Sequence, residues 1–408
     1  MKKKLWTKDF SRITFATVLS AIGGEAMNLP VSLLVFDETN STFWSALVMV
    51  CGMLPDILFP VLIAPLIDKG GKKRWIVGLD MLLVVLYAGM GLWISGHEFR
   101  IELYLAFVLI VGTISVFYRL AYTSWYPDLI PNGLEQKGYA VSSMLYPIVT
   151  IAMSPVAAFL YEKTSMQNIF FIVTGITVVS VLVESNIREK RKVGKENYTL
   201  RQYCNDIREG FIYLKKEKGI RNIYMNMGVM QGTSEGMGLI TQAYYQTQPF
   251  LTVTMLGFLI SSEMIGRAFG GLLQYKKEIP VKKRYPFTKF VYLIYSAVDM
   301  IILFLPYPAM LISRFVCGGL GISSATIRET AVQSYLPEQM RARVNAFFDV
   351  LFAIGGVLFQ FLAGALGQFV PYRAAAVFIG MISIASILFF IILPDKVNRP
   401  IYEAVRSE

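Results

Sequence analysis

Residues 64–75, APLIDKGGKKRW, place five charged residues and two glycines between two long apolar runs. The run at 43–67 leads into this loop, and the run at 75–96 follows it. A transmembrane helix needs about 20 mainly apolar residues, and both runs are long enough. We therefore expect the loop to join two membrane-spanning helices.

The composition of the whole chain fits a membrane protein better than a soluble one. Of its 408 residues, 55% are hydrophobic and only 16% are charged, and the mean hydropathy is +0.52. Soluble domains average about 25% charged residues, and a soluble fold this apolar would expose large hydrophobic patches. The basic start of the chain, MKKKLWTKDFSR, leads into an apolar run too long for a cleavable signal peptide. We therefore expect an all-α integral membrane protein.

Twelve apolar segments are long enough to span a bilayer, and they form two series. A polar stretch at 186–220 separates the series and is too charged to cross a membrane. Between Tyr198 and Lys218 its apolar residues recur at helical spacing, which favours an amphipathic helix on the membrane surface over a frayed linker. We predict an N-terminal half at 1–185, a cytoplasmic linker at 186–220 and a C-terminal half at 221–408. The expected spans are 11–35, 43–67, 75–96, 101–126, 138–161 and 167–185, then 221–246, 251–274, 287–305, 308–333, 343–367 and 372–393.

The basic residues give the predicted spans a direction. They lie mainly in alternate loops, together with the N-terminus, the linker and the C-terminus, whereas the opposite loops carry little beyond Arg100, Lys163 and Arg373. Cytoplasmic loops of membrane proteins are enriched in Lys and Arg, so we expect both termini to be cytoplasmic. The same distribution explains the net charge of +11 without a nucleic-acid partner. We expect a multi-pass protein of the cytoplasmic membrane, in contact with lipids and monomeric.

The two series of spans are related by an internal repeat. Shifting the sequence by 210 residues aligns charged positions that seldom match by chance in a chain with so few charges. Two parallel six-helix halves, related by an axis along the membrane normal, are a repeat type that secondary transporters use, with substrate held near the midplane. We therefore predict two pseudo-symmetric six-helix halves. The aligned positions are Glu25 with Glu235, Asp68 with Glu278, residues 72–74 with 282–284, and residues 127–128 with 337–338.

The loop at 64–75 resembles the signature loop of the major facilitator superfamily, Gly-x-x-x-Asp-(Arg/Lys)-x-Gly-(Arg/Lys)-(Arg/Lys). Ala64 stands where the family has its first glycine. In the family, the acid of this loop and an acid at the inner end of the fourth helix help to hold the outward-facing state. The resemblance implies such a conformational latch here, formed by the matching residues Asp68, Lys69, Gly71, Lys72 and Lys73 with Asp128.

Two further stretches, PDLIPNGLEQKGYAVSS at 127–143 and YLPEQMRARVNAFF at 335–348, are similar to the bacterial macrolide-efflux and enterobactin-exporter branch of this superfamily. The resemblance implies a twelve-helix fold and export of a drug-like molecule in exchange for protons. The chain departs from the antiporter pattern in the fifth span, where Ser154 and Pro155 replace the usual Gly-Pro. Pro155 can still bend that helix.

Charged residues inside spanning helices are costly, so each is a functional candidate. At about 1.5 Å per residue, Asp56 lies roughly 18 Å from the cytoplasmic edge and Glu25 roughly 21 Å from the start of its helix. Two nearby carboxylates in a low dielectric favour binding of a proton. We predict Glu25 as the leading proton-coupling residue, with Asp56, Glu235 and Glu263 as further candidates. The alternative is that Glu25 and Glu235 bond to backbone or serine groups at a helix kink.

The spans also contain arginines. Glu263 and Arg267 are four residues apart, so they lie on one helix face and are predicted to form an ion pair. Arg328 and Asp349 lie at similar depth on consecutive helices, which favours a gating or structural salt bridge over substrate contact.

Arg119 matches the fourth-span arginine that drug antiporters of the resembled superfamily often carry and that is implicated in proton movement. It is therefore a further proton-coupling candidate. The alternatives are a bond to a backbone carbonyl and an ion pair with Asp128.

Aromatic residues and methionines are candidates for a substrate cavity. Tyr118 and Tyr122 lie one turn apart and could line an amphipathic pocket or stack on a cation. Met27 and Met144 offer adaptable surfaces for varied substrates. Lipid contact is the alternative for the methionines.

The remaining function classes are disfavoured by what the sequence lacks. It has one histidine, His97, no metal-ligand spacing and no phosphate-binding glycine loop. We therefore predict neither an enzyme nor an ATP-driven pump, with no cofactor or metal. The favoured function is proton-coupled export of an amphipathic small molecule by alternating access. Alternatives are export of a siderophore or lipid-like metabolite, uptake of a nutrient, and a non-transporting receptor or scaffold of transporter ancestry.

Overall fold

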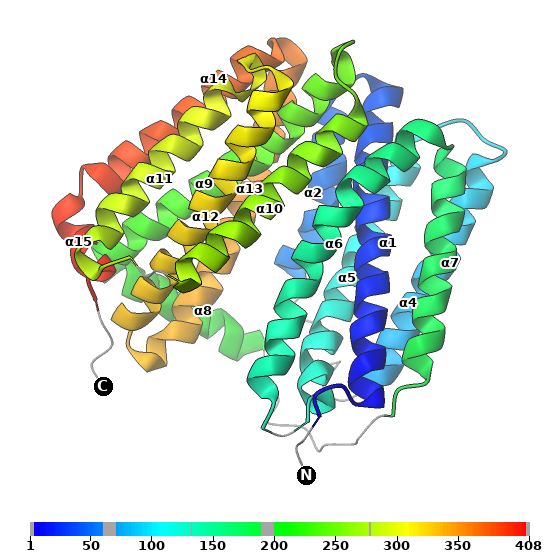
Figure 1. The fold of residues 1–408 in the computed structure, drawn as a ribbon, viewed down its shortest axis with the longest axis horizontal. Coiled ribbons are helices and arrows are strands. Elements are labelled where there is room, and N and C mark those ends of the chain that lie inside the picture. The colour runs from blue at the N-terminus through cyan, green and yellow to red at the C-terminus, as the bar shows by residue number, and fades with distance from the viewer. Residues whose placement is uncertain (1–3, 60–70, 132, 189–199, 277–278, 405–408) are drawn as a thin grey trace. The chain divides into compact units, whose positions relative to one another are not determined.

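The computed structural model describes residues 4–59, 71–131, 133–188, 200–276 and 279–404 (Figure 1). Within these ranges the regular structure is entirely helical, with no strand. Asp68 and Lys69 lie outside the described residues. The chain separates into two compact units. Unit 1 comprises residues 1–40, 51–200 and 253–257, and unit 2 comprises residues 41–50, 201–252 and 258–408.

Before residue 200, the helices other than α2 are long and closely follow the predicted spans. They are α1 (Lys8–Thr39), α2 (Thr42–Leu58), α4 (Lys72–Ile94), α5 (Ile101–Leu129), α6 (Glu135–Lys163) and α7 (Met166–Ser185). Thr7 caps α1 by accepting a hydrogen bond from the Phe10 amide, and Ser165 caps α7 in the same way from Asn168. Such caps satisfy amides at a helix start that have no intrahelical partner.

The second series follows the amphipathic segment, which forms α8 (Leu200–Lys216). In α8, Leu214 is buried whereas Phe211 and Ile212 are exposed. The later elements are α9 (Lys218–Thr247), α10 (Val253–Lys276), α11 (Val281–Ile301), η1 (Ile302–Phe304), α12 (Tyr307–Tyr335), α13 (Glu338–Phe369), α14 (Tyr372–Ser386), η2 (Ile387–Ile392) and α15 (Asp395–Tyr402).

Ten helices in the described part of the chain are long and apolar enough to cross a membrane. They are α1, α4, α5, α6, α7, α10, α11 with η1, α12, α13, and α14 with η2. Helix α2 is 17 residues long in the described range, and the 30-residue α9 carries the polar residues Asn226, Gln231 and Glu235. The predicted all-α membrane fold is confirmed, and the spans at 43–67 and 221–246 stay predictions.

The same pairs of helices pack together in the two units. In unit 1, α1 packs against α6 and α7, and α4 packs against α5 and α7. In unit 2, α9 packs against α13 and α14, and α11 packs against α12 and α14. A shift of 210 residues carries each pair of the first set onto a pair of the second set.

Each unit also contains a short segment from the opposite side of the 186–220 linker. In unit 2, the Thr42 hydroxyl at the start of α2 donates to the Gly364 carbonyl of α13 at 2.7 Å. In unit 1, Gly257 of α10 lies so close to α6 that a Cβ there would be 2.6 Å from the Pro155 Cα. Small residues allow helices in membranes to approach this closely.

Candidate functional site

Unit 1 contains a cavity of about 530 Å³. Residues from α1, α2, α4, α5, α6 and α7 line it, so six helices border the cavity. The charged lining residues are Glu25, Asp56, Asp80 and Arg119, and the aromatic ones include Tyr118 and Tyr122. We call this space the acidic cavity because three carboxylates share it with a single arginine.

Arg119 neutralises one of these carboxylates. Its Nη2 lies 2.6 Å from Asp56 Oδ1, which joins α5 to α2. The two side chains are 56% and 48% exposed, so water screens the pair and its contribution to stability is modest. The partner of Arg119 is therefore Asp56, rather than the Asp128 or backbone carbonyl given as alternatives.

Glu25 has a neutral partner. Its Oε1 accepts a hydrogen bond of 2.8 Å from the Thr150 hydroxyl, which joins α1 to α6. Among the described residues, no basic group lies within 4.0 Å of the Glu25 carboxylate. Glu25 and Asp56 line the same cavity, as their predicted depths suggested, but only Asp56 is paired with a cation.

Two acids that sequence reasoning missed lie together beside this cavity. Asp80 on α4 is 2% exposed and Glu184 on α7 is 0% exposed, and their carboxyl groups lie within hydrogen-bonding range of each other. The Tyr118 hydroxyl donates to Glu184 Oε1 at 2.9 Å. Both acids fall inside predicted spans, so a full census of charges in the apolar runs would have found them. We call them the buried acid pair.

The predicted latch is described only in part. Lys72 Nζ lies 3.2 Å from Asp128 Oδ2 and donates to the Ser124 carbonyl at 2.7 Å, so it ties the start of α4 to the end of α5. Gly71 is the residue before α4, and Lys73 lines a separate, open cavity on unit 1. Lys72 and Asp128 of the predicted latch are therefore in contact, and the latch itself stays a prediction.

Unit 2 holds its acids differently. Glu263 accepts hydrogen bonds of 2.9 Å from Arg267 on the same helix and from the Tyr295 hydroxyl of α11. The predicted pair of Glu263 and Arg267 is thus present. It belongs to a larger group of charges, whose other members the sequence did not predict. Arg314 of α12 lies 2.9 Å from Asp299 and 3.7 Å from Glu263. We call Glu263, Arg267, Asp299 and Arg314 the charge cluster.

Close packing of α10 against α12 brings this cluster together. A Cβ on Gly318 would clash with the Glu263 carbonyl, and one on Gly266 would clash with the Phe315 carbonyl. Only glycine lets the two backbones approach to this distance. The acid of α10 and the arginine of α12 therefore reach each other because the residues beside them are small.

The other charged candidates in unit 2 have different surroundings. Glu235 accepts from the amide of Gln231 at 2.8 Å, so its neighbours are neutral donors. Arg328 donates to the Met227 sulfur at 2.7 Å. Arg328 and Asp349 line one polar cavity of about 320 Å³, which brings the two predicted partners into the same space.

Of the aromatic and methionine candidates, only the two tyrosines line the acidic cavity. The rings of Tyr118 and Tyr122 stack with centroids 6.3 Å apart and an interplanar angle of 11°, and both line the acidic cavity. Met27 is 2% exposed in the core of unit 1, and Met144 is 59% exposed; neither is part of the cavity lining. The tyrosines therefore suit substrate contact in this cavity better than the methionines.

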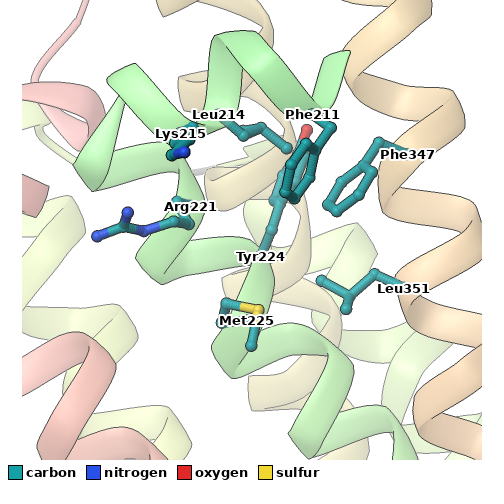
Figure 2. Close-up of a pocket in the computed structure, with 8 residues that line it drawn as sticks. All are labelled: Phe211, Leu214, Lys215, Arg221, Tyr224, Met225, Phe347 and Leu351. Atoms are coloured by element: carbon teal, nitrogen blue, oxygen red, sulfur yellow. The ribbon is translucent and has the colours of Figure 1, made fainter. Parts of the chain in front are cut away.

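A smaller pocket of about 190 Å³ in unit 2 lies among α8, α9 and α13 (Figure 2). Figure 2 shows Lys215 and Arg221 on one side of it and Phe347 and Leu351 on the other. Its lining contains basic and apolar side chains without an acid. It is therefore not a candidate for binding a proton or a cation.

Comparison with known proteins decides the family. The family model of the Major Facilitator Superfamily matches residues 13–307. The chain belongs to this superfamily. Macrolide efflux protein A of Streptococcus pyogenes is 24% identical to the transporter over 286 residues, which cover 67% of this chain and 69% of that protein. Macrolide efflux protein A of Enterococcus faecalis is 26% identical over 240 residues, which cover 56% and 72%.

Solved structures agree on the fold. A peptide transporter POT in complex with alafosfalin has a TM-score of 0.73 to this transporter at 10% identity, covering 96% of this chain and 95% of that chain. At such low identity the likeness shows the fold alone. Family and fold together identify a multi-pass transporter of small molecules rather than an enzyme, and they confirm the resemblance found in the sequence.

Proposed function

We propose that this transporter exports an amphipathic, neutral or cationic drug-like molecule across the cytoplasmic membrane in exchange for protons. In this proposal twelve spans form two pseudo-symmetric six-helix halves, with both termini cytoplasmic. The recurrence of the same helix pairs in the two units supports the duplicated architecture. The names of the relatives support a macrolide-type substrate.

The observation that carries the proposal is the acidic cavity. Its lining combines carboxylates that outnumber the basic groups with the stacked rings of Tyr118 and Tyr122. Aromatic faces and an unneutralised carboxylate together favour an amphipathic cation, because the rings contact its apolar body and the acid attracts its charge. An anionic substrate would meet net repulsion there.

Glu25 is the residue at which substrate and proton compete in this proposal. It lines the cavity, and the Thr150 hydroxyl can serve as a donor when the carboxylate is ionised. A carboxylate that binds either a proton or a cation, but not both, exchanges one for the other across the membrane. Arg119 has the secondary role of pairing with Asp56.

The test is transport of radiolabelled erythromycin, an amphipathic amine, into proteoliposomes with an acidic interior. We expect the imposed pH gradient to raise uptake by the parent at least tenfold. Each pH unit is a tenfold ratio of proton concentrations, which can drive an accumulation of that size. Glu25→Gln should remove most of this gain. Glu98→Gln, an exposed acid in the loop before α5, is the matched control and should behave as the parent. Parent uptake that ignores the gradient would overturn proton exchange.

A further inference from the structure

We propose that Asp80 and Glu184 form a proton-binding site of this transporter that is distinct from Glu25. The inference rests on the proton-coupled transport proposed above and adds to it a second, buried group. The site is made by the packing of α4 against α7, which places one carboxyl from each helix side by side.

Hydrogen bonds fix the geometry of this pair. Tyr118 of α5 donates to Glu184 Oε1 at 2.9 Å. The hydroxyls of Ser20 and Ser180 lie 3.2 Å apart, beside the Asp80 carboxyl. Asp80 Oδ2 and Glu184 Oε2 are buried without a partner. Glu184 is therefore positioned by a donor from α5, and each of the two acids retains a free acceptor atom.

The charges around the pair do not neutralise it. Among the described residues, no Lys, Arg or His nitrogen lies within 4.0 Å of either carboxyl. Two ionised carboxylates side by side, out of water and without a cation, would repel one another strongly. A proton held between them removes the repulsion and makes a carboxyl–carboxylate hydrogen bond. The other charged and titratable groups that line the cavity with Asp80 are Glu25 of α1, Asp56 of α2, Tyr87 of α4, Tyr118, Arg119 and Tyr122 of α5, and Tyr146 of α6.

The cavity gives this proton a path. Asp80 lines the acidic cavity, whereas Glu184 is behind it and fully buried. A proton from cavity water binds as O–H on Asp80 and is shared with Glu184, and it leaves to cavity water by the same route. No other atom changes its bonding, so the step needs no further reactant.

Tyr118 connects this site to substrate. Its ring lines the cavity beside Tyr122, and its hydroxyl bonds to Glu184. A substrate that displaces the Tyr118 ring would withdraw a donor from the pair. Hydrogen bonds from neutral donors favour the charged form of a carboxyl, so this loss would favour retention of the proton.

The test measures proton binding directly, in the purified full-length protein without substrate. Infrared difference spectra recorded during a titration between about pH 5 and pH 9 follow the C=O band of protonated carboxyls. We expect a titrating band in the parent and in Glu98→Gln, and its loss in Asp80→Asn and Glu184→Gln. A band that is unchanged in both variants, or absent from the parent, would overturn the proposal.

Transport distinguishes a coupling site from a merely structural pair. Glu184→Gln should keep downhill erythromycin flux within about twofold of the parent but lose the gradient-driven accumulation, a loss of about tenfold. Equal accumulation in the variant and the parent would refute a coupling role. If the parent moved no erythromycin, the proposed substrate would fail while the infrared band would still decide whether the pair binds a proton.

Tyr118→Phe provides a variant that keeps both acids. It removes the donor to Glu184 while leaving a ring of the same size in the cavity wall. We expect the carboxyl C=O band to move in frequency, because the frequency depends on the hydrogen bonds that the carboxyl makes. An unmoved band would show that Glu184 is not the group that titrates.

Discussion

Asp299 and Glu263 in unit 2 lie 2.9 Å and 3.7 Å from Arg314, whereas Asp80 and Glu184 in unit 1 lie beside one another. In the described part of the chain, neither Asp80 nor Glu184 has a basic group within 4.0 Å. Both groups are buried in helices that cross the apolar region. An acid opposite an arginine stays ionised, while two acids opposite each other need a proton.

This difference suggests a division of labour between the units. The charge cluster joins α10, α11 and α12 through fixed ion pairs, so it suits a structural role. The buried acid pair changes its charge when it gains or loses a proton, so it suits coupling. Four substitutions test this contrast, from the largest expected effect to the smallest.

Replacement of the central arginine of the charge cluster should have the largest effect. Arg314→Met leaves Asp299 and Glu263 buried without their shared cation, and breaking a buried ion pair in this way costs about 3–5 kcal/mol of unfolding free energy. Denaturant unfolding in detergent micelles measures the change. Adding Asp299→Asn should recover part of the loss. A loss below about 1 kcal/mol would mean that the cluster is not structural.

Replacement of Gly318, where α12 packs against α10 beside the charge cluster, should cause the second-largest loss of unfolding free energy. Gly318→Ala forces α12 away from the Glu263 backbone, and overpacking of this kind costs about 1–3 kcal/mol. Gly271→Ala on α10 is the matched control, because a Cβ there meets no atom within 4 Å. It should be neutral or stabilising. Equal stability of the two variants would show that the close approach of α10 and α12 contributes nothing.

The buried acid pair should respond in the opposite way to the charge cluster. In the proposal, Glu184 shares a proton with Asp80. Glu184→Gln replaces this carboxyl by a neutral amide of similar shape, so the unfolding free energy at pH 7 should change by less than about 1 kcal/mol. The same micelle assay used for Arg314→Met gives the comparison. A loss of about 3 kcal/mol or more would indicate that Glu184 is ionised and paired.

The smallest effect is expected for a half-buried ion pair. Lys289 Nζ lies 2.5 Å from Asp395 Oδ1, and its hydrogen bond and charge hold the pKa of Asp395 below the ordinary 3.8. Because the folded pKa is depressed, the pair stabilises the protein above pH 3.8 and this stabilisation is lost as the pH falls further. Asp395→Asn should therefore cost about 0.2–1 kcal/mol at pH 7.

The difference between this variant and the parent should vanish as the pH falls through the depressed pKa of Asp395. Thermal unfolding in micelles at several pH values measures it. A difference that persists unchanged in acid would show that Asp395 contributes through packing rather than through its charge.

Much of the fold could be predicted from the sequence. Runs of apolar residues predict helices because the backbone must satisfy its own hydrogen bonds in a bilayer. The loop at 64–75 predicted the superfamily, and the family comparison confirmed it. The contact between Glu263 and Arg267 could also be predicted, because residues four apart on a helix face each other whatever surrounds them.

The partners of the remaining charges were decided by tertiary structure alone. Asp56 lies with Arg119, Asp80 with Glu184, and Asp299 with Arg314, each from a different pair of helices. Which side chains meet depends on how each helix is rotated and how closely it packs, and a chain of apolar segments does not specify this. The sequence by itself therefore determined that helices cross the membrane and which superfamily they belong to. Only the tertiary structure decided which acids have a cation beside them and which have another acid, because those contacts join residues far apart in the chain.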